Sequence, residues 1–217
     1  MSMTWMRAPG ETWAGTAASF LSMWTVMTVA MMLPSLVPML GRYRQAVAGE
    51  DGGRLDPATA VVGAGYLFVW AVVGMVVFVV GVAFASLAMR QPAVARGVPA
   101  AAGVIVVVAG RLQFSAWKAR HLACWRDAPQ PGVALPSGMM FAWRHGVRLG
   151  VHCAQASAGL MAVLLAIGVM DPAGMVLVGA AITAERVAPA GDRIAHAIGA
   201  VVVAGGAVLM GRAAGIG

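Results

Sequence analysis

The stretch "GYLFVWAVVGMVVFVVGVAFASL", from Gly65 to Leu87, decides the fold class of this sequence. It contains no charged residue, and it exceeds the roughly 20 apolar residues that a helix needs to cross a bilayer. The whole 217-residue chain has the same character, because 60% of its residues are hydrophobic and only 11% are charged. A soluble domain usually carries about 25% charged residues. Together with a mean hydropathy of +0.83, this composition places the chain in a lipid bilayer.

Six segments are long and apolar enough to be spanning helices. They predict an all-α fold, a single six-helix membrane domain over residues 1–217, without a second domain or a clear repeat. The expected spans are roughly Gly15–Leu40, Gly65–Leu87, Val98–Trp117, Val147–Met170, Pro172–Ala188 and Ile194–Gly211. The first span is longer than a bilayer needs, so we expect it to tilt or to project. The N-terminus lacks the pattern of a cleaved signal peptide, and none is expected.

The distribution of basic residues predicts the orientation. Cytoplasmic loops of membrane proteins are enriched in Lys and Arg. With six spans, the first, third and fifth loops share one side, and these loops with their flanks carry most of the 15 basic residues: Arg42, Arg44, Arg54, Arg111, Lys118, Arg120, Arg126, Arg144, Arg148, Arg186 and Arg193. We therefore expect the cytoplasm on that side and both termini outside. The net charge of +7 is then a sign of topology and does not indicate nucleic acid.

Candidate metal ligands gather toward the same predicted side. His121 and Cys124 lie three residues apart in the third loop. His145 and His152 are seven apart, so they share one face of a helix, and Cys153 follows directly. Imidazole and thiolate ligands suit copper or zinc, and thioether groups add a preference for Cu(I). The alternative is that these are ordinary loop, interfacial and core residues.

Two further residues on this side are possible ligands. Glu185 lies near the end of the fifth segment, and His196 lies near the start of the sixth. Ionisable groups at membrane depth are functional candidates by default. Glu185 is also explained as an interfacial charge paired with its neighbour Arg186.

Methionines repeat along the first segment, in "MWTVMTVAMMLPSLVP". Met23, Met27 and Met31 follow one another at intervals of four residues, and Met32 comes next. They predict either a ladder of thioether ligands for Cu(I) or a helix face that packs with methionine, which fills irregular gaps well. Met31 and Met32 are nearer the predicted cluster and are therefore the better possible ligands.

Small residues mark a packing face on the fourth segment. Gly146 and Gly150 form a G-x-x-x-G pattern, which lets helix backbones approach closely in lipid. We therefore expect helix packing at these two glycines, either within the chain or between copies of it.

Several blocks of the chain resemble a bacterial domain-of-unknown-function family of predicted metal-binding integral membrane proteins. The resemblance starts with "MWTVMTVAMMLPSLVPMLGRYR", which is similar to the family signature W-x-x-M-x-x-A-M-M-x-P-x-x-x-P-M. It continues, in the expected order, through "GYLFVW", "LQFSAWK", "RHGVRLGVHC", "GLMAVLLAIGVMD" and "AERVAPAG". The resemblance implies a multi-pass protein of the bacterial cytoplasmic (inner) membrane that is associated with metal.

The sequence also departs from this family. Relative to this family, we expect the usual first helix to be missing, and the family's two loop cysteines correspond here to His121 and Cys124. In the fourth segment Cys153 remains from the family's C-x-G-C-C-W pattern, whereas the positions of G-C-C-W hold Gln155, Ala156, Ser157 and Ala158. Either histidines share the task of the lost thiols, or the site has decayed while the scaffold persists.

Two functions remain open from the sequence. The first is binding or handling of a transition metal, copper before zinc. The second is a non-catalytic accessory subunit that packs against other membrane proteins, or against further copies of this chain, within the lipid bilayer. An enzyme is not favoured, because no nucleophile–base pair, phosphate loop or paired carboxylate site is apparent.

Overall fold

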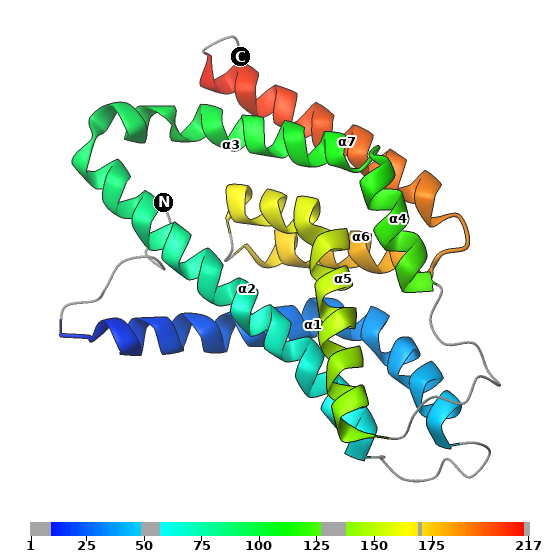
Figure 1. Ribbon diagram of the computed structural model, residues 1–217. Coiled ribbons are helices and arrows are strands. Elements are labelled where there is room, and N and C mark those ends of the chain that lie inside the picture. The colour runs from blue at the N-terminus through cyan, green and yellow to red at the C-terminus, as the bar shows by residue number, and fades with distance from the viewer. Residues whose placement is uncertain (1–9, 49–56, 127–137, 169–170, 215–217) are drawn as a thin grey trace.

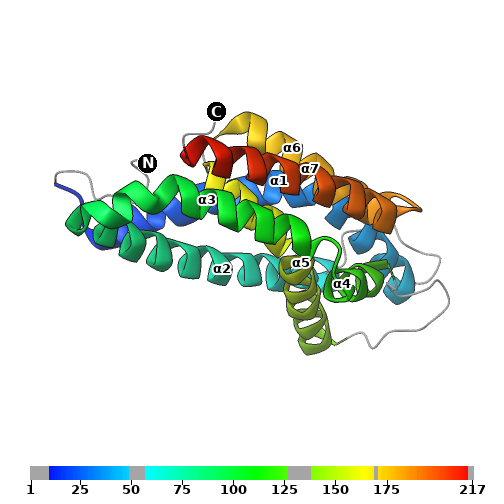
Figure 2. The ribbon, with the colours of Figure 1, turned by 90° about the horizontal axis from the view of Figure 1, so that it is seen from above.

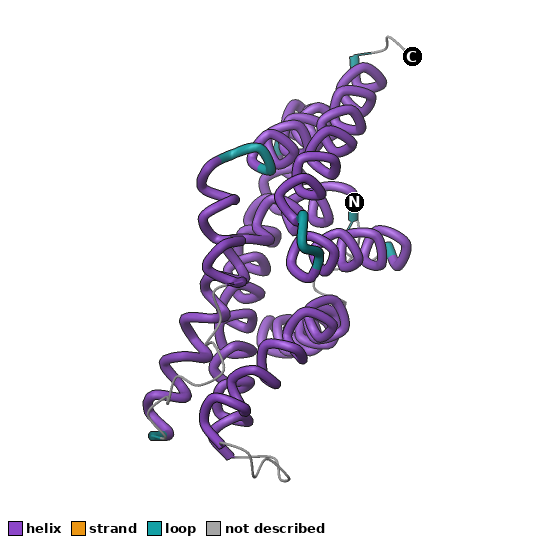
Figure 3. Tube along the Cα trace, turned by 90° about the vertical axis from the view of Figure 1, so that its right-hand side faces the viewer, coloured by secondary structure: helices purple, strands orange, loops and turns teal. Residues whose placement is uncertain are grey.

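The structure is a computed structural model that describes residues 10–48, 57–126, 138–168 and 171–214, without the side chains of residues 46–48 and 124–126. Each regular element in these ranges is a helix (Figure 3). In chain order they are α1 (Trp13–Ala48), α2 (Pro57–Arg90), α3 (Pro92–Leu112), α4 (Ala116–Arg126), α5 (Met139–Ile167), α6 (Pro172–Val187) and α7 (Gly191–Ala213). The predicted all-α class is therefore confirmed.

The long helices alternate in direction. The C-terminal ends of α1, α3 and α6 lie toward the right of Figure 1, whereas those of α2, α5 and α7 lie toward the left. Seen from above, α2, α3 and α7 run in roughly the same direction (Figure 2), although α2 is steeply inclined to α3 in the view of Figure 1. This alternation is the arrangement expected of a chain that crosses a bilayer repeatedly.

The number of spans differs from the sequence prediction. Five of the described helices, namely α1, α2, α3, α5 and α7, are long and apolar enough to cross a membrane. The predicted fifth span is α6, which has 16 residues and is shorter than the roughly 20 that a full crossing needs. It is short because it begins at Pro172, with Asp171 capping the Gly174 amide at 2.8 Å, and ends just before Pro189.

The predicted third loop, Lys118–Arg144, also needs correction. Its first part belongs to α4, which covers Ala116–Arg126. The sequence "AWKARHLACWR" contains no glycine or proline, and Ala, Lys, Arg and Leu all favour helix. This additional helix places Lys118 and His121 on a defined surface that packs against α5.

Helix α1 continues through two internal prolines, Pro34 and Pro38. Proline removes one backbone donor and crowds the preceding turn, so it kinks a helix. The second half of α1 changes direction accordingly (Figure 1). The bend falls on the part of α1 that carries Met32 and Ser35, two residues of the site described below.

Helices α2 and α5 approach each other closely through the predicted glycine face. A Cβ atom at Gly146 would collide with the backbone of Val62, and one at Gly150 would lie 3.1 Å from the Tyr66 carbonyl oxygen. The expected contact at these glycines is therefore confirmed. It brings Tyr66 on α2 within reach of Cys153 on α5.

Candidate metal centre

The centre of the site is a pair of buried sulfur atoms from α1 and α5. The Sγ of Cys153 lies 3.9 Å from the Sδ of Met32. Cys153 is fully buried, and only 1% of Met32 is exposed. The hydroxyl of Tyr66, on α2, lies 2.9 Å from the same Sγ. Three helices thus place a thiol, a thioether and a phenol together inside the protein.

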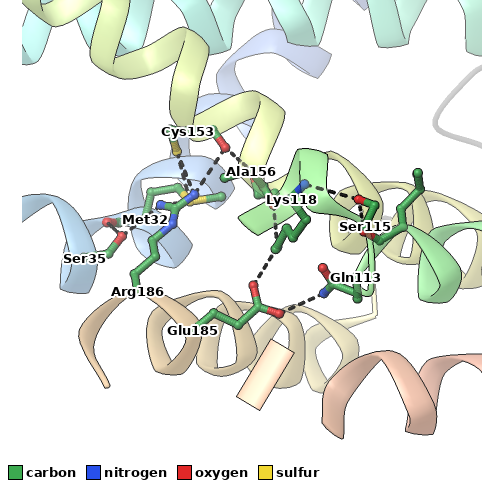
Figure 4. Close-up of polar contacts among 11 residues, drawn as sticks. Met32, Ser35, Gln113, Ser115, Lys118, Cys153, Ala156, Glu185 and Arg186 are labelled. Atoms are coloured by element: carbon green, nitrogen blue, oxygen red, sulfur yellow. Dashed lines mark hydrogen bonds and ion pairs between the residues drawn. The ribbon is translucent and has the colours of Figure 1, made fainter. Parts of the chain in front are cut away.

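Arg186 of α6 points its guanidinium toward this sulfur pair (Figure 4). Its Nη2 donates to the Sγ of Cys153 at 3.1 Å and to the Cys153 carbonyl oxygen at 3.2 Å. Its Nη1 donates to the Ser35 hydroxyl at 3.1 Å and lies 3.7 Å from the Sδ of Met32. A fixed positive charge therefore faces both sulfur atoms.

A second polar group lies beside the sulfur pair and shares the helix α6. The Nζ of Lys118 lies 2.7 Å from the Glu185 carboxylate, and both side chains are almost entirely buried. The amide of Gln113 donates to the other oxygen of Glu185 at 2.8 Å, as Figure 4 shows. Burial lowers the pKa of Lys118, while the carboxylate of Glu185 opposes part of that shift.

Two of the predicted histidines meet at the contact between α4 and α5. The Nδ1 atoms of His121 and His152 lie 3.5 Å apart. The ring of His121 also packs edge-on against Trp117, with 4.6 Å between ring centroids. Burial lowers the pKa of His121, and the charges of His152 and Arg120 lower it further. This shift favours the neutral form of His121, which is the form that can bind a metal.

The remaining predicted ligands belong neither to the sulfur pair of Cys153 and Met32 nor to the histidine pair of His121 and His152. His145 stacks on Tyr43 with 5.1 Å between ring centroids, and its buried Nε2 has no hydrogen-bond partner among the residues that the structure describes. His196 is exposed and stacks on Phe114. Met31 lies against Gly179 of α6. The side chain of Cys124 is outside the described residues.

The described part of the chain holds no group of three or more His, Cys, Asp or Glu residues placed to bind a metal ion. A site within it would therefore use fewer such ligands, or would include thioether groups. His121 and His152 would be a site with only two such ligands. Cys153 and Met32 would be a site that includes a thioether group.

Comparison with known proteins identifies the family to which the chain belongs. The family model PpoB2, described as a copper chaperone, matches residues 21–209. This chain belongs to the PpoB2 family. The match extends from α1 to α7 and includes Met32, His121, Cys153 and Arg186. No curated protein and no solved structure matches the chain.

Membership of the PpoB2 family confirms part of the resemblance expected from the sequence. The family is one tied to copper, in agreement with the expectation of a metal-associated protein. The expected missing helix and lost cysteines stay predictions.

Sequence reasoning missed several residues of the site, namely Tyr66, Gln113, Lys118 and Arg186. From the sequence, Lys118 counts only among the basic flanks of the loops, whereas Arg186 counts there and as the neighbour paired with Glu185. A signal was available for both, because a charged residue at the end of an apolar segment is often retained for a role inside a membrane protein. No periodicity in the sequence could show which sulfur or carboxylate each would contact.

Proposed function

We propose that this protein is an integral membrane copper chaperone that binds Cu(I) at the buried sulfur pair of Cys153 and Met32. Family membership supports copper as the cargo. The observation that carries the proposal is the 3.9 Å separation of the two sulfur atoms, which come from helices far apart in sequence.

The chemistry of the donor atoms favours copper over zinc. Thiolate and thioether groups are soft ligands that select Cu(I). Structural zinc sites instead use four ligands from Cys, His and carboxylate groups in tetrahedral geometry. A cysteine with a methionine therefore fits a soft monovalent ion, which accepts two or three such ligands.

His121 and His152 are proposed as a second, more accessible copper site. The two imidazoles lie side by side, and His152 precedes Cys153 in the chain. In this proposal copper passes between the histidine pair and the sulfur pair. Cys124 and His145 are proposed to assist at the same end of the protein, with Met31, Glu185 and His196 as more remote candidates.

Copper loading of single-site variants tests this function. Reduced protein in detergent, incubated with Cu(I) held by a competing chelator, is expected to retain about one copper per chain at the sulfur pair. Cys153→Ser should remove most of this copper, and Met32→Leu should weaken its binding. Met161→Leu is the matched control, because Met161 is another buried methionine of the core.

Two outcomes would contradict the proposal. If Cys124→Ser removed the copper and Cys153→Ser did not, the site would lie at the end of α4. If the folded protein took up no copper and copurified with a stoichiometric membrane partner, the accessory-subunit function would be favoured instead.

A further inference from the structure

The position of Arg186 is unusual for a group beside a cation site. Its guanidinium donates to the Cys153 thiol at 3.1 Å and lies 3.7 Å from the Met32 thioether. Only 5% of the residue is exposed, and an arginine does not lose its charge in proteins. Any metal ion bound by these sulfur atoms would therefore lie close to a permanent positive charge.

The charge balance of the site depends on the valence of the metal. Binding requires the thiolate form of cysteine, and a thiolate at Cys153 together with the Arg186 guanidinium carries no net charge. A monovalent ion adds one positive charge, and a divalent ion adds two. At about 4 Å and an effective dielectric constant of about 20, the guanidinium disfavours one extra unit charge by on the order of 100-fold to 1,000-fold relative to the same site with a neutral side chain at position 186.

We infer that Arg186 is the residue that sets the charge selectivity of the sulfur pair, admitting soft monovalent ions such as Cu(I) and Ag(I) and rejecting soft divalent ions such as Cd(II). This inference rests on the proposed copper function. It assigns Arg186 a role through electrostatics and not as a ligand, because a guanidinium has no lone pair for a metal.

The surroundings of Arg186 allow its guanidinium to stay nearby when a metal binds. The Ser35 hydroxyl and the Cys153 carbonyl oxygen accept from it at 3.1 Å and 3.2 Å. A cavity of about 220 Å³ adjoins Arg186 and is also lined by Arg42 and Pro189. Movement of the side chain toward this cavity would release the sulfur atoms while the guanidinium stays close enough to repel a second charge.

Competition between Ag(I) and Cd(II) tests the inference in the purified full chain. Both metals would be measured by equilibrium dialysis and elemental analysis, with wild type, Arg186→Gln and Arg186→Lys compared. Wild type should bind Ag(I) and discriminate strongly against Cd(II). Arg186→Gln should lower the ratio of the Ag(I) affinity to the Cd(II) affinity by at least about tenfold. Arg186→Lys keeps the positive charge and should keep this ratio close to that of wild type.

Arg42→Gln is the matched control, because Arg42 lines the same cavity but is exposed. It should leave the ratio unchanged. If Arg186→Gln bound both ions with the wild-type ratio, the inference would be overturned although the copper site stood. If Arg186→Gln did not fold, loss of selectivity in Arg186→Lys would overturn it equally. Failure of wild type to bind Ag(I) would instead remove the proposed function itself.

Discussion

At the scale of single residues, mutation of the buried ion pair of Lys118 and Glu185 should lower the stability of the protein. Removing one partner of a buried pair leaves the other charge without compensation, at a cost of about 3–5 kcal/mol. Glu185→Gln should therefore lower the thermal unfolding temperature in detergent markedly. The double variant Lys118→Met/Glu185→Leu should recover much of the loss, because it removes both charges. Equal stability of Glu185→Gln and wild type would show that the pair does not contribute to folding.

At the scale of helices, the contact of α2 with α5 depends on Gly146. A methyl group there would meet the backbone of Val62, which cannot turn away as a flexible side chain could. Overpacking of this kind typically costs about 1–3 kcal/mol. Gly146→Ala should therefore destabilise the protein, as measured by thermal unfolding.

Gly63→Ala provides the comparison on the facing helix. In the described part of the chain, no atom from beyond the adjacent helix backbone lies within 4 Å of a Cβ atom added at Gly63, and alanine favours helix over glycine by about 1 kcal/mol. This variant should be as stable as wild type or slightly more so. If both alanine variants behaved alike, the close helix contact would not be limiting for stability.

The methionine row of α1 is the second feature at this scale. Met23, Met27 and Met31 line an apolar groove between α1 and α6, with Met175 on the α6 side. Met27 and Met31 are also buried in the core, as packing residues are. Leucine has a similar volume, and such swaps usually cost less than about 1.5 kcal/mol each. The triple change to leucine should therefore preserve folding and copper binding.

Copper loading of the folded triple variant distinguishes the two roles of these methionines. If the triple variant loads copper at the wild-type rate, the three methionines are packing residues. A folded variant that loads copper much more slowly would show that the row conducts Cu(I).

At the scale of the whole molecule, the prediction concerns orientation. Arg42 of α1 and Arg186 of α6 line the same cavity, and Arg44 follows Arg42 on α1; basic residues mark the cytoplasmic side. In a Cys153→Ser background, Cys124 should stay unlabelled by an impermeant thiol reagent in sealed cells and react once the membrane is opened. A cysteine introduced by Ala214→Cys lies near the C-terminus, which is predicted to be outside, and it should therefore react with the reagent in sealed cells. The reverse pattern would invert the topology.

The sequence alone determined the fold class and the candidate ligands in part. Long uncharged runs such as Gly65–Leu87 leave a helix as the only solution in lipid, because every backbone polar group must be satisfied within the segment. Cys153 and Met32 could be selected for their soft sulfur atoms. The glycine pattern at Gly146 also predicted a close contact, since small residues act through local spacing.

Only the tertiary structure decided which of these residues meet. Cys153 and Met32 are 121 positions apart, and Arg186 is 154 positions from Met32. Their contact depends on how α1, α5 and α6 pack, and no local spacing encodes that. The same packing turned Cys153 toward the core and left His152 beside His121 on α4. His152 and Cys153 are adjacent in sequence, yet His152 belongs to the histidine pair and Cys153 to the sulfur pair, because successive residues of a helix project about 100° apart.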